Sequence, residues 1–189
     1  MWRRKKMAKL SPRLSFILPL FGFAVLLVIS GIALFSTLSG TRDITQLPSV
    51  LIGKPPPQTE LALLSEASEF LDFSAFSGEV IAINFFASWC APCRAEAPAL
   101  EQLSKTLPII GIAYKDKPDD TTSFLQQYGN PFRQIGMDAD GRTGLAWGLY
   151  GVPETYLIDR SGKIMLRHAG PIDKSVMEQL ILPAIAGAR

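Results

Sequence analysis

Residues 80–94 read VIAINFFASWCAPCR, and this stretch joins a strand pattern to two cysteines that are two residues apart. Its first half, Val80–Phe86, is almost continuously apolar, which is typical of a strand covered on both faces of a sheet. A helical pattern follows from Ala91 to about Lys105, with Pro92 in the first turn, where its missing N–H costs nothing. The stretch therefore predicts a strand, a turn and a helix, with a C-x-x-C motif at the helix start.

This placement favours redox chemistry at the two cysteines. Thiol–disulfide exchange needs a thiolate, and a free thiol with a pKa of about 8.5 supplies little of it at neutral pH. At a helix N-terminus, unpaired N–H groups and the positive end of the helix dipole stabilise the anion. We therefore expect Cys90 to be the nucleophile. Cys93, one turn later and more covered, would resolve the mixed disulfide that Cys90 forms with a substrate.

Zinc sites and structural disulfides also use cysteine pairs. A tetrahedral zinc site wants four ligands, and the chain holds two cysteines and one histidine, His168, so we predict no metal site. A disulfide across two residues closes a very small loop, which removes little chain entropy from the unfolded state. We interpret His168 as a partly exposed structural side chain.

Outside the motif, strand and helix patterns alternate along the chain. Right-handed crossovers would make the first two strands parallel, and a hairpin near the C-terminus would add antiparallel ones. The sequence thus predicts an α/β fold of three layers, a mixed β-sheet flanked by helices. Strands are expected at 80–86, 108–114, near 133–135, 155–159 and 163–167, and helices at 91–105, 119–128, 141–147 and 173–185.

The N-terminal part has a different composition. Six of the 19 Lys and Arg residues lie in the first thirteen positions, and none of the residues from Phe16 to Leu38 is charged. As a helix this apolar stretch would be roughly 35 Å long, enough to cross a hydrocarbon core of about 30 Å. We predict a basic cytoplasmic tail over 1–13 and a transmembrane anchor over 14–39, with the rest exported. A cleaved signal peptide is the alternative, but the stretch exceeds the roughly 7–15 residues of a signal h-region.

The remainder of the chain is mildly acidic, with 13 basic against 17 acidic residues. Nucleic-acid binding needs a clustered basic face, so we exclude nucleic acid as a partner. The stretch before the first weak strand pattern ends in GKPPP at 53–57, which favours an extended backbone. We therefore predict a linker over 40–58 and a folded domain over 59–189.

Residues 85–94, followed by Pro98, resemble the thioredoxin superfamily. More narrowly, the chain is similar to the membrane-anchored thiol:disulfide interchange proteins of cytochrome c maturation, the DsbE/CcmG group. The likeness covers roughly Gly53 to the C-terminus and implies a thioredoxin-like fold. Further matching pieces are the N-terminal anchor, Gly53-Lys54-Pro55, Gly151-Val152-Pro153-Glu154-Thr155, and Ile158-Asp159 followed by Gly162.

The resemblance also implies roles for residues around the motif. The Val152–Pro153 bond would be cis, in a loop beside the active disulfide whose backbone pairs with the substrate chain. The implied substrate-binding set is Trp89, Pro92, Val152 and Pro153.

Two acids are implied to tune the cysteines: Glu96, one turn after Cys93, and Glu154, next to Pro153. Carboxylates near a thiol raise its pKa by like-charge repulsion and can accept its proton. The implied catalytic set is therefore Cys90, Cys93, Glu96, Pro153 and Glu154. Asn84 stands where cytoplasmic thioredoxins have a buried aspartate, and an asparagine cannot relay a proton.

The resemblance implies a reductant that works without a cofactor beyond the Cys90–Cys93 disulfide. Its client would be the haem-attachment C-x-x-C-H disulfide of apocytochrome c, and an upstream membrane thiol donor of DsbD or CcdA type would recharge it. The haem-ligation machinery is a further implied partner. The implied location is the bacterial inner membrane, with a single pass, the N-terminus in the cytoplasm and the thioredoxin-like domain in the periplasm.

Two alternatives stay open. One is a membrane-tethered reductase for another client, such as a metallochaperone or a sporulation-type factor. The other is a non-catalytic binding module, against which the intact cysteine pair argues. The direction of electron flow depends on the resemblance alone, because potentials in the superfamily span about 150 mV.

Overall fold

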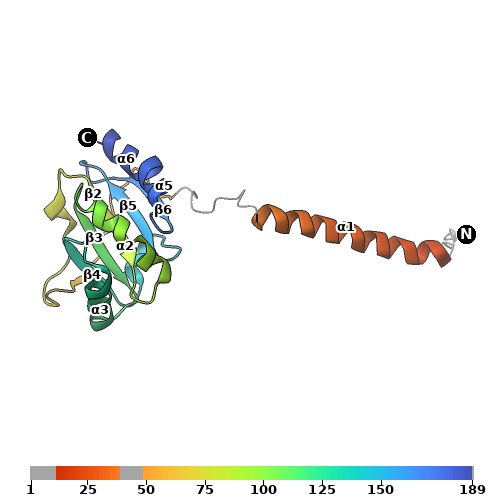
Figure 1. Cartoon of the computed structure of the whole chain (residues 1–189), viewed down its shortest axis with the longest axis horizontal. Coiled ribbons are helices and arrows are strands. Elements are labelled where there is room, and N and C mark those ends of the chain that lie inside the picture. Colours follow the sequence, from red (N-terminus) through yellow and green to blue (C-terminus); the bar gives the residue numbers. More distant parts are fainter. Residues whose placement is uncertain (1–11, 39–48, 189) are drawn as a thin grey trace, which may run out of the picture. The chain divides into compact units, whose positions relative to one another are not determined.

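The structure is a computed structural model that describes residues 12–38 and 49–188 (Figure 1). Its contacts divide the chain into two units, residues 1–44 and 45–189. Most of the predicted tail over 1–13 and part of the predicted linker over 40–58 lie outside the described residues.

The first unit contains the helix α1, Pro12–Leu38. Its segment Pro19–Ser36 has a mean hydropathy of 2.3, and none of that segment is buried inside the protein. Such a helix is long and apolar enough to cross a membrane, and Pro19 inside it is tolerated in that setting. Within the described residues, α1 is the one candidate membrane span, at the position predicted for the anchor.

The second unit is built on a mixed sheet with the strand order β1-β4-β3-β2-β5-β6. The neighbours β2, β3 and β4 are parallel, whereas β5, β6 and the short β1 are paired antiparallel. This confirms the predicted mixed sheet, with the C-x-x-C strand β2 at its centre. The strands are β1 (Ala62–Leu63), β2 (Ile81–Phe86), β3 (Ile109–Tyr114), β4 (Gln134–Asp138), β5 (Glu154–Ile158) and β6 (Ile164–Ala169).

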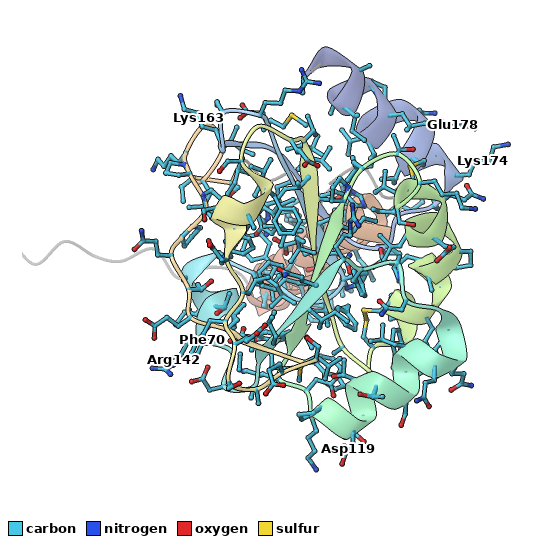
Figure 2. All side chains as sticks on the ribbon, turned by 90° about the vertical axis from the view of Figure 1, so that its left-hand side faces the viewer. Phe70, Asp119, Arg142, Lys163, Lys174 and Glu178 are labelled. Carbon is cyan, nitrogen blue, oxygen red and sulfur yellow. A yellow bond between two sulfur atoms is a disulfide. The ribbon has the colours of Figure 1, made fainter. Side chains whose placement is uncertain are left out.

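Helices cover both faces of this sheet, so the domain has the three layers that the sequence predicts. Figure 2 shows α2, α3 and the C-terminal helices along one side of the sheet, and η2 and α4 on the other. The bounds are η2 (Phe73–Phe76), α2 (Ala91–Leu103), α3 (Pro118–Tyr128), α4 (Arg142–Ala146), α5 (Lys174–Val176), the π-helical turn η3 (Met177–Ile181) and α6 (Leu182–Gly187).

Alternation along the strands divides the core between the two faces. Ala82 and Leu157 pack with Leu103 of α2 and with Ile181 and Ile185 near the C-terminus. On the other face a second cluster combines strand residues with a side chain that follows α4 and with an aromatic of η2. Its members include Ile83, Phe85, Tyr156, Trp147 and Phe73. This arrangement fixes β2, and with it the start of α2, in the middle of the domain.

Two expectations were wrong. The folded domain begins before residue 59, because Leu51 packs against the core and the Gly53 N–H donates to the Ile164 carbonyl at 2.8 Å. The backbone of Gly53 and Lys54 thereby pairs with Ile164 at the start of β6. His168 is buried, not partly exposed. It pairs with Thr155 across β5 and β6 and so faces the side covered by α2.

Candidate active site

Cys90 and Cys93 form a disulfide at the N-terminus of α2, with an S–S distance of 2.07 Å. Cys90 is the N-cap residue of the helix, and the Cys93 N–H donates to Cys90 Sγ at 3.1 Å. The same N–H can stabilise a thiolate on Cys90 after reduction. The geometry therefore supports Cys90 as the attacking thiol.

The expected difference in exposure between the two cysteines is not found in this disulfide form. Cys90 is 3% exposed and Cys93 2% exposed. The bond holds Cys90 Sγ against the first turn of α2, and the partly buried Val152 packs on the cluster that contains both sulfurs. In this form both cysteines are buried to nearly the same extent, so exposure alone does not separate the attacking sulfur from the resolving one.

The loop before β5 lies beside the disulfide, as the resemblance implied. The Val152–Pro153 peptide bond is cis. Val152 contacts the cysteine cluster, and the Pro153 carbonyl accepts a hydrogen bond from the Gly170 N–H at 2.9 Å. On the other side of Cys90, Trp89 is 57% exposed, and Pro92 is exposed as well. The structure thus places three of the predicted substrate-binding residues, Trp89, Pro92 and Val152, around the disulfide.

Glu96 is a buried carboxyl one helical turn after Cys93. Its Oε1 accepts from Asn84 Nδ2 at 3.1 Å and its Oε2 accepts from the Ile172 N–H at 3.0 Å. Burial raises the pKa of Glu96 to about 7, although both hydrogen bonds favour the ionised form. A carboxyl with this pKa can take up or release a proton at neutral pH.

Asn84 joins Glu96 to the sheet. Its Nδ2 also donates to Thr155 Oγ1 at 3.0 Å, and Asn84, Thr155 and Glu96 are all buried. Its Oδ1 has no hydrogen-bond partner in the described part of the chain. Sequence reasoning did not find Thr155, because the register that pairs it with Asn84 is visible only in the folded sheet.

Glu154 lies on the opposite face of the sheet. Thr155 faces α2 with Asn84, so its neighbour Glu154, opposite Phe85, points to the other side. There its buried carboxylate pairs with Arg167 and accepts from the Tyr156 hydroxyl and from the Tyr150 N–H. Burial is the largest cause that raises the pKa of the Tyr156 hydroxyl, and the nearby Glu154 raises it further. The hydroxyl therefore stays protonated.

The structure consequently brings Glu96, but not Glu154, to the face of the sheet that carries the disulfide. That Glu154 acts on the thiols stays a prediction, and its contacts tie the loop before Pro153 to β6. Arg167 was missed by sequence reasoning. Its position in a predicted strand gave no signal, because an exposed basic residue has the same pattern.

A disulfide at the start of the helix after a central strand can be opened by an incoming thiol and closed again by its own second sulfur. Together with the cis-proline loop, this defines the class of thiol–disulfide oxidoreductases with the thioredoxin fold. Residues 51–181 match the sequence model of the Redoxin family.

Known proteins narrow the class further. The chain is 40% identical over 147 residues to the thiol:disulfide interchange protein HelX of Rhodobacter capsulatus, covering 77% of this chain and 84% of the relative. It is 38% identical over 182 residues to a thiol:disulfide interchange protein DsbE homolog of Paracoccus denitrificans, covering 96% and 98%. A crystal structure of a Chlorobium tepidum protein assigned as a DsbE interchange protein aligns with a TM-score of 0.61 and 31% identity, covering 69% of this chain and 95% of that one. The chain therefore belongs to the Redoxin family and to its DsbE-type thiol:disulfide interchange proteins, which confirms the resemblance drawn from the residues.

Proposed function

We propose that this protein reduces disulfides of client proteins outside the cytoplasm, and that its main client is the haem-attachment C-x-x-C-H segment of apocytochrome c. The observation that carries the reducing direction is the buried Glu96 one turn from the cysteine pair. Its ionised form disfavours a thiolate nearby by like-charge repulsion. A pair whose thiolate is disfavoured prefers the disulfide, and its reduced form is therefore a good electron donor.

The proposed reaction moves two electrons in two exchange steps. The Cys90 thiolate attacks one sulfur of the client disulfide, and the other client sulfur leaves as a thiolate that takes up a proton. Cys93 then loses its proton to the Glu96 carboxylate and attacks Cys90 Sγ, and the second client sulfur leaves as a thiolate that takes up a proton from the medium. The Cys90–Cys93 disulfide that results is reduced again by an upstream membrane dithiol of DsbD or CcdA type. The pair itself carries the electrons, so the proposal needs no further cofactor.

The proposed location is the bacterial inner membrane. The apolar helix α1 would span the bilayer, and the basic residues before it favour a cytoplasmic N-terminus with the domain in the periplasm. Cysteine labelling with a membrane-impermeant reagent tests this orientation, with the reduced pair expected to react in intact spheroplasts.

The client is tested by trapping it. The chain has two cysteines, so Cys93→Ser leaves Cys90 without a resolving partner and should accumulate the mixed disulfide. We expect mass spectrometry to find peptides of c-type cytochromes that contain the C-x-x-C-H segment. The double variant Cys90→Ser/Cys93→Ser is the control that should trap nothing. Trapping only a metallochaperone or another thiol protein would favour the alternative reductase.

Deletion of the gene is the second test. We expect loss of holo-cytochrome c, restored by the wild-type chain but not by Cys90→Ser. Normal holo-cytochrome c in the deletion strain would exclude the proposed client. Full rescue by Cys90→Ser would instead favour a non-catalytic binding module.

A further inference from the structure

The turn that leads into Cys90 belongs to neither of the elements it connects. It follows β2 and precedes α2, and the Cys90 N–H donates to the Ala87 carbonyl at 3.2 Å. Ser88 and Trp89 are its two central residues. Contacts with another part of the chain hold both of them.

Asp116 holds the first of these residues. It lies two positions after the end of β3 and is only 6% exposed. Its Oδ2 accepts from the Ser88 N–H and its Oδ1 accepts from Ser88 Oγ, both at 2.7 Å. The same carboxylate accepts from the Lys117 N–H and from Thr121 Oγ1 at 3.0 Å. Two bonds thus go to the turn before Cys90 and two to the first turn of α3.

Lys115 holds the second residue. Its carbonyl accepts a hydrogen bond from the Trp89 indole Nε1 at 3.2 Å. Lys115 has φ 47°, a left-handed backbone conformation that residues other than glycine seldom adopt. Its N–H donates to the Asp138 carbonyl at 2.8 Å, and its ammonium lies 5.2 Å from the centre of the Tyr114 ring. These contacts hold the left-handed residue in place beside the indole.

We propose that Lys115 and Asp116 form a clamp on the turn 87–90, and that Asp116 is a positioning residue for thiol exchange. β2 and β3 are parallel neighbours, so their carboxyl ends meet at one edge of the sheet and the clamp can reach the turn directly. The clamp keeps Cys90 Sγ in line with the Cys93 N–H and keeps the indole beside it. A misplacement of about 1 Å at reacting atoms can cost about a hundredfold in rate.

Two other roles for Asp116 predict different results. As a cap of α3 alone, it would affect stability but not the thiol. As a nearby negative charge alone, it would raise the pKa of Cys90 by repulsion, so that any neutral replacement would lower this pKa. The clamp predicts the opposite direction when the turn is released, because Cys90 then loses its alignment with the helix N-terminus.

The test measures the reaction of Cys90 with iodoacetamide against pH. It uses the full chain in detergent micelles with Cys93→Ser, so that Cys90 is the only thiol. Asp116→Ala is expected to move the Cys90 titration to higher pH by about one unit, which slows alkylation at pH 7 by about tenfold. Asp116→Asn keeps an acceptor for the Ser88 N–H without the charge, and its rate should stay within about threefold of wild type.

Three further variants separate the clamp from a role in stability. Ser88→Ala leaves both α3 contacts in place and should shift the titration in the same direction as Asp116→Ala, but less, even if Asp116→Ala does not fold. Thr121→Val should lower the unfolding temperature without moving the titration. Asp119→Asn, at an exposed position that Figure 2 shows pointing outward from the same helix, should leave the titration unchanged and lower the unfolding temperature less than Thr121→Val does.

The clamp is overturned if folded Asp116→Ala and Ser88→Ala titrate like wild type, or if both Asp116 variants move the titration to lower pH. It is also overturned if Thr121→Val shifts Cys90 as much as Asp116→Ala does. Alkylation needs no client protein, so these outcomes are independent of whether apocytochrome c is the substrate.

Discussion

Asn84 on the central strand donates a hydrogen bond to Glu96 on the active-site helix, with 3.1 Å between Nδ2 and Oε1. This bond joins the residue that stands in place of an aspartate to the acid one turn after Cys93. The asparagine cannot accept a proton, but it holds a carboxyl that can. Burial raises the pKa of that carboxyl to about 7, within the range where it exchanges protons with the medium.

Glu96→Gln tests the proton-accepting role directly. The amide keeps the size of the side chain but cannot take the proton of Cys93, so the second exchange step should slow by about a hundredfold. In wild type the rate of this step should increase as the pH rises through about 7, because Glu96 becomes ionised. The variant should lose this rising limb of the pH–rate profile. Rapid-mixing kinetics with a disulfide peptide measure both effects. Glu101→Gln, an exposed acid on the same helix, is the control, and an equal loss in both variants would contradict the role.

The same carboxyl should make stability depend on pH. Its pKa is about 7 in the folded protein against 4.5 as the unperturbed value, so the folded state binds more protons between these pH values. Unfolding free energy should therefore be highest below about pH 4.5, fall as the pH rises, and level off above about pH 7. The raised pKa corresponds to about 3 kcal/mol between these limits. Urea unfolding of wild type and Glu96→Gln at pH 5 and pH 8 measures the difference, and identical pH dependence would refute the assignment.

Asn84→Ala should move the proton equilibrium of Glu96 further. The lost hydrogen bond favours the ionised carboxylate, so its removal raises the pKa of Glu96 above the wild-type value. The pH limb of the second exchange step should shift to higher pH. Stability should fall by about 1–3 kcal/mol, because a buried polar group loses a partner. Asn84→Asp would place two carboxyls together and should shift the limb at least as far upward. A downward shift in either variant would show that Asn84 does not face Glu96 in solution.

The sequence predicts most of this site. The residues that it does not predict are placed there by contacts between segments that are far apart in the chain. Cys90, Cys93 and Pro92 are local in sequence, so their arrangement follows from a strand pattern that runs into a helix pattern. Asp116 is different, because it contacts Ser88 only through the parallel pairing of β2 with β3. A buried strand followed by an acid was a usable signal, since the carboxyl ends of adjacent parallel strands share an edge.

Whether a side chain of a strand is buried or exposed is harder to predict from the sequence than the position of the strand itself. His168 and Arg167 lie in a strand whose polar side chains suggest a solvated surface. The loop after β6 covers the first, and Glu154 pairs with the second. The prolines that follow the segment 51–54 predict a linker there, whereas its backbone hydrogen bonds to β6 depend on a strand more than a hundred residues away.

The ion pair between Glu154 and Arg167 yields the last prediction. Its side chains are 0% and 5% exposed, so Arg167→Met should leave a buried carboxylate without its cation and destabilise the domain by about 3–5 kcal/mol. The double variant Arg167→Met/Glu154→Gln removes both charges and should recover a large part of that loss in urea unfolding. The exposed pair Lys174–Glu178, labelled in Figure 2, is the matched control, and Lys174→Met should cost less than about 1 kcal/mol.

Because the network of Glu154 and Arg167 also holds the Tyr150 N–H in the loop before Pro153, Arg167→Met should raise KM for a disulfide peptide more than it lowers kcat. A stable Arg167→Met protein with unchanged KM would show that the pair neither stabilises the fold nor positions the loop.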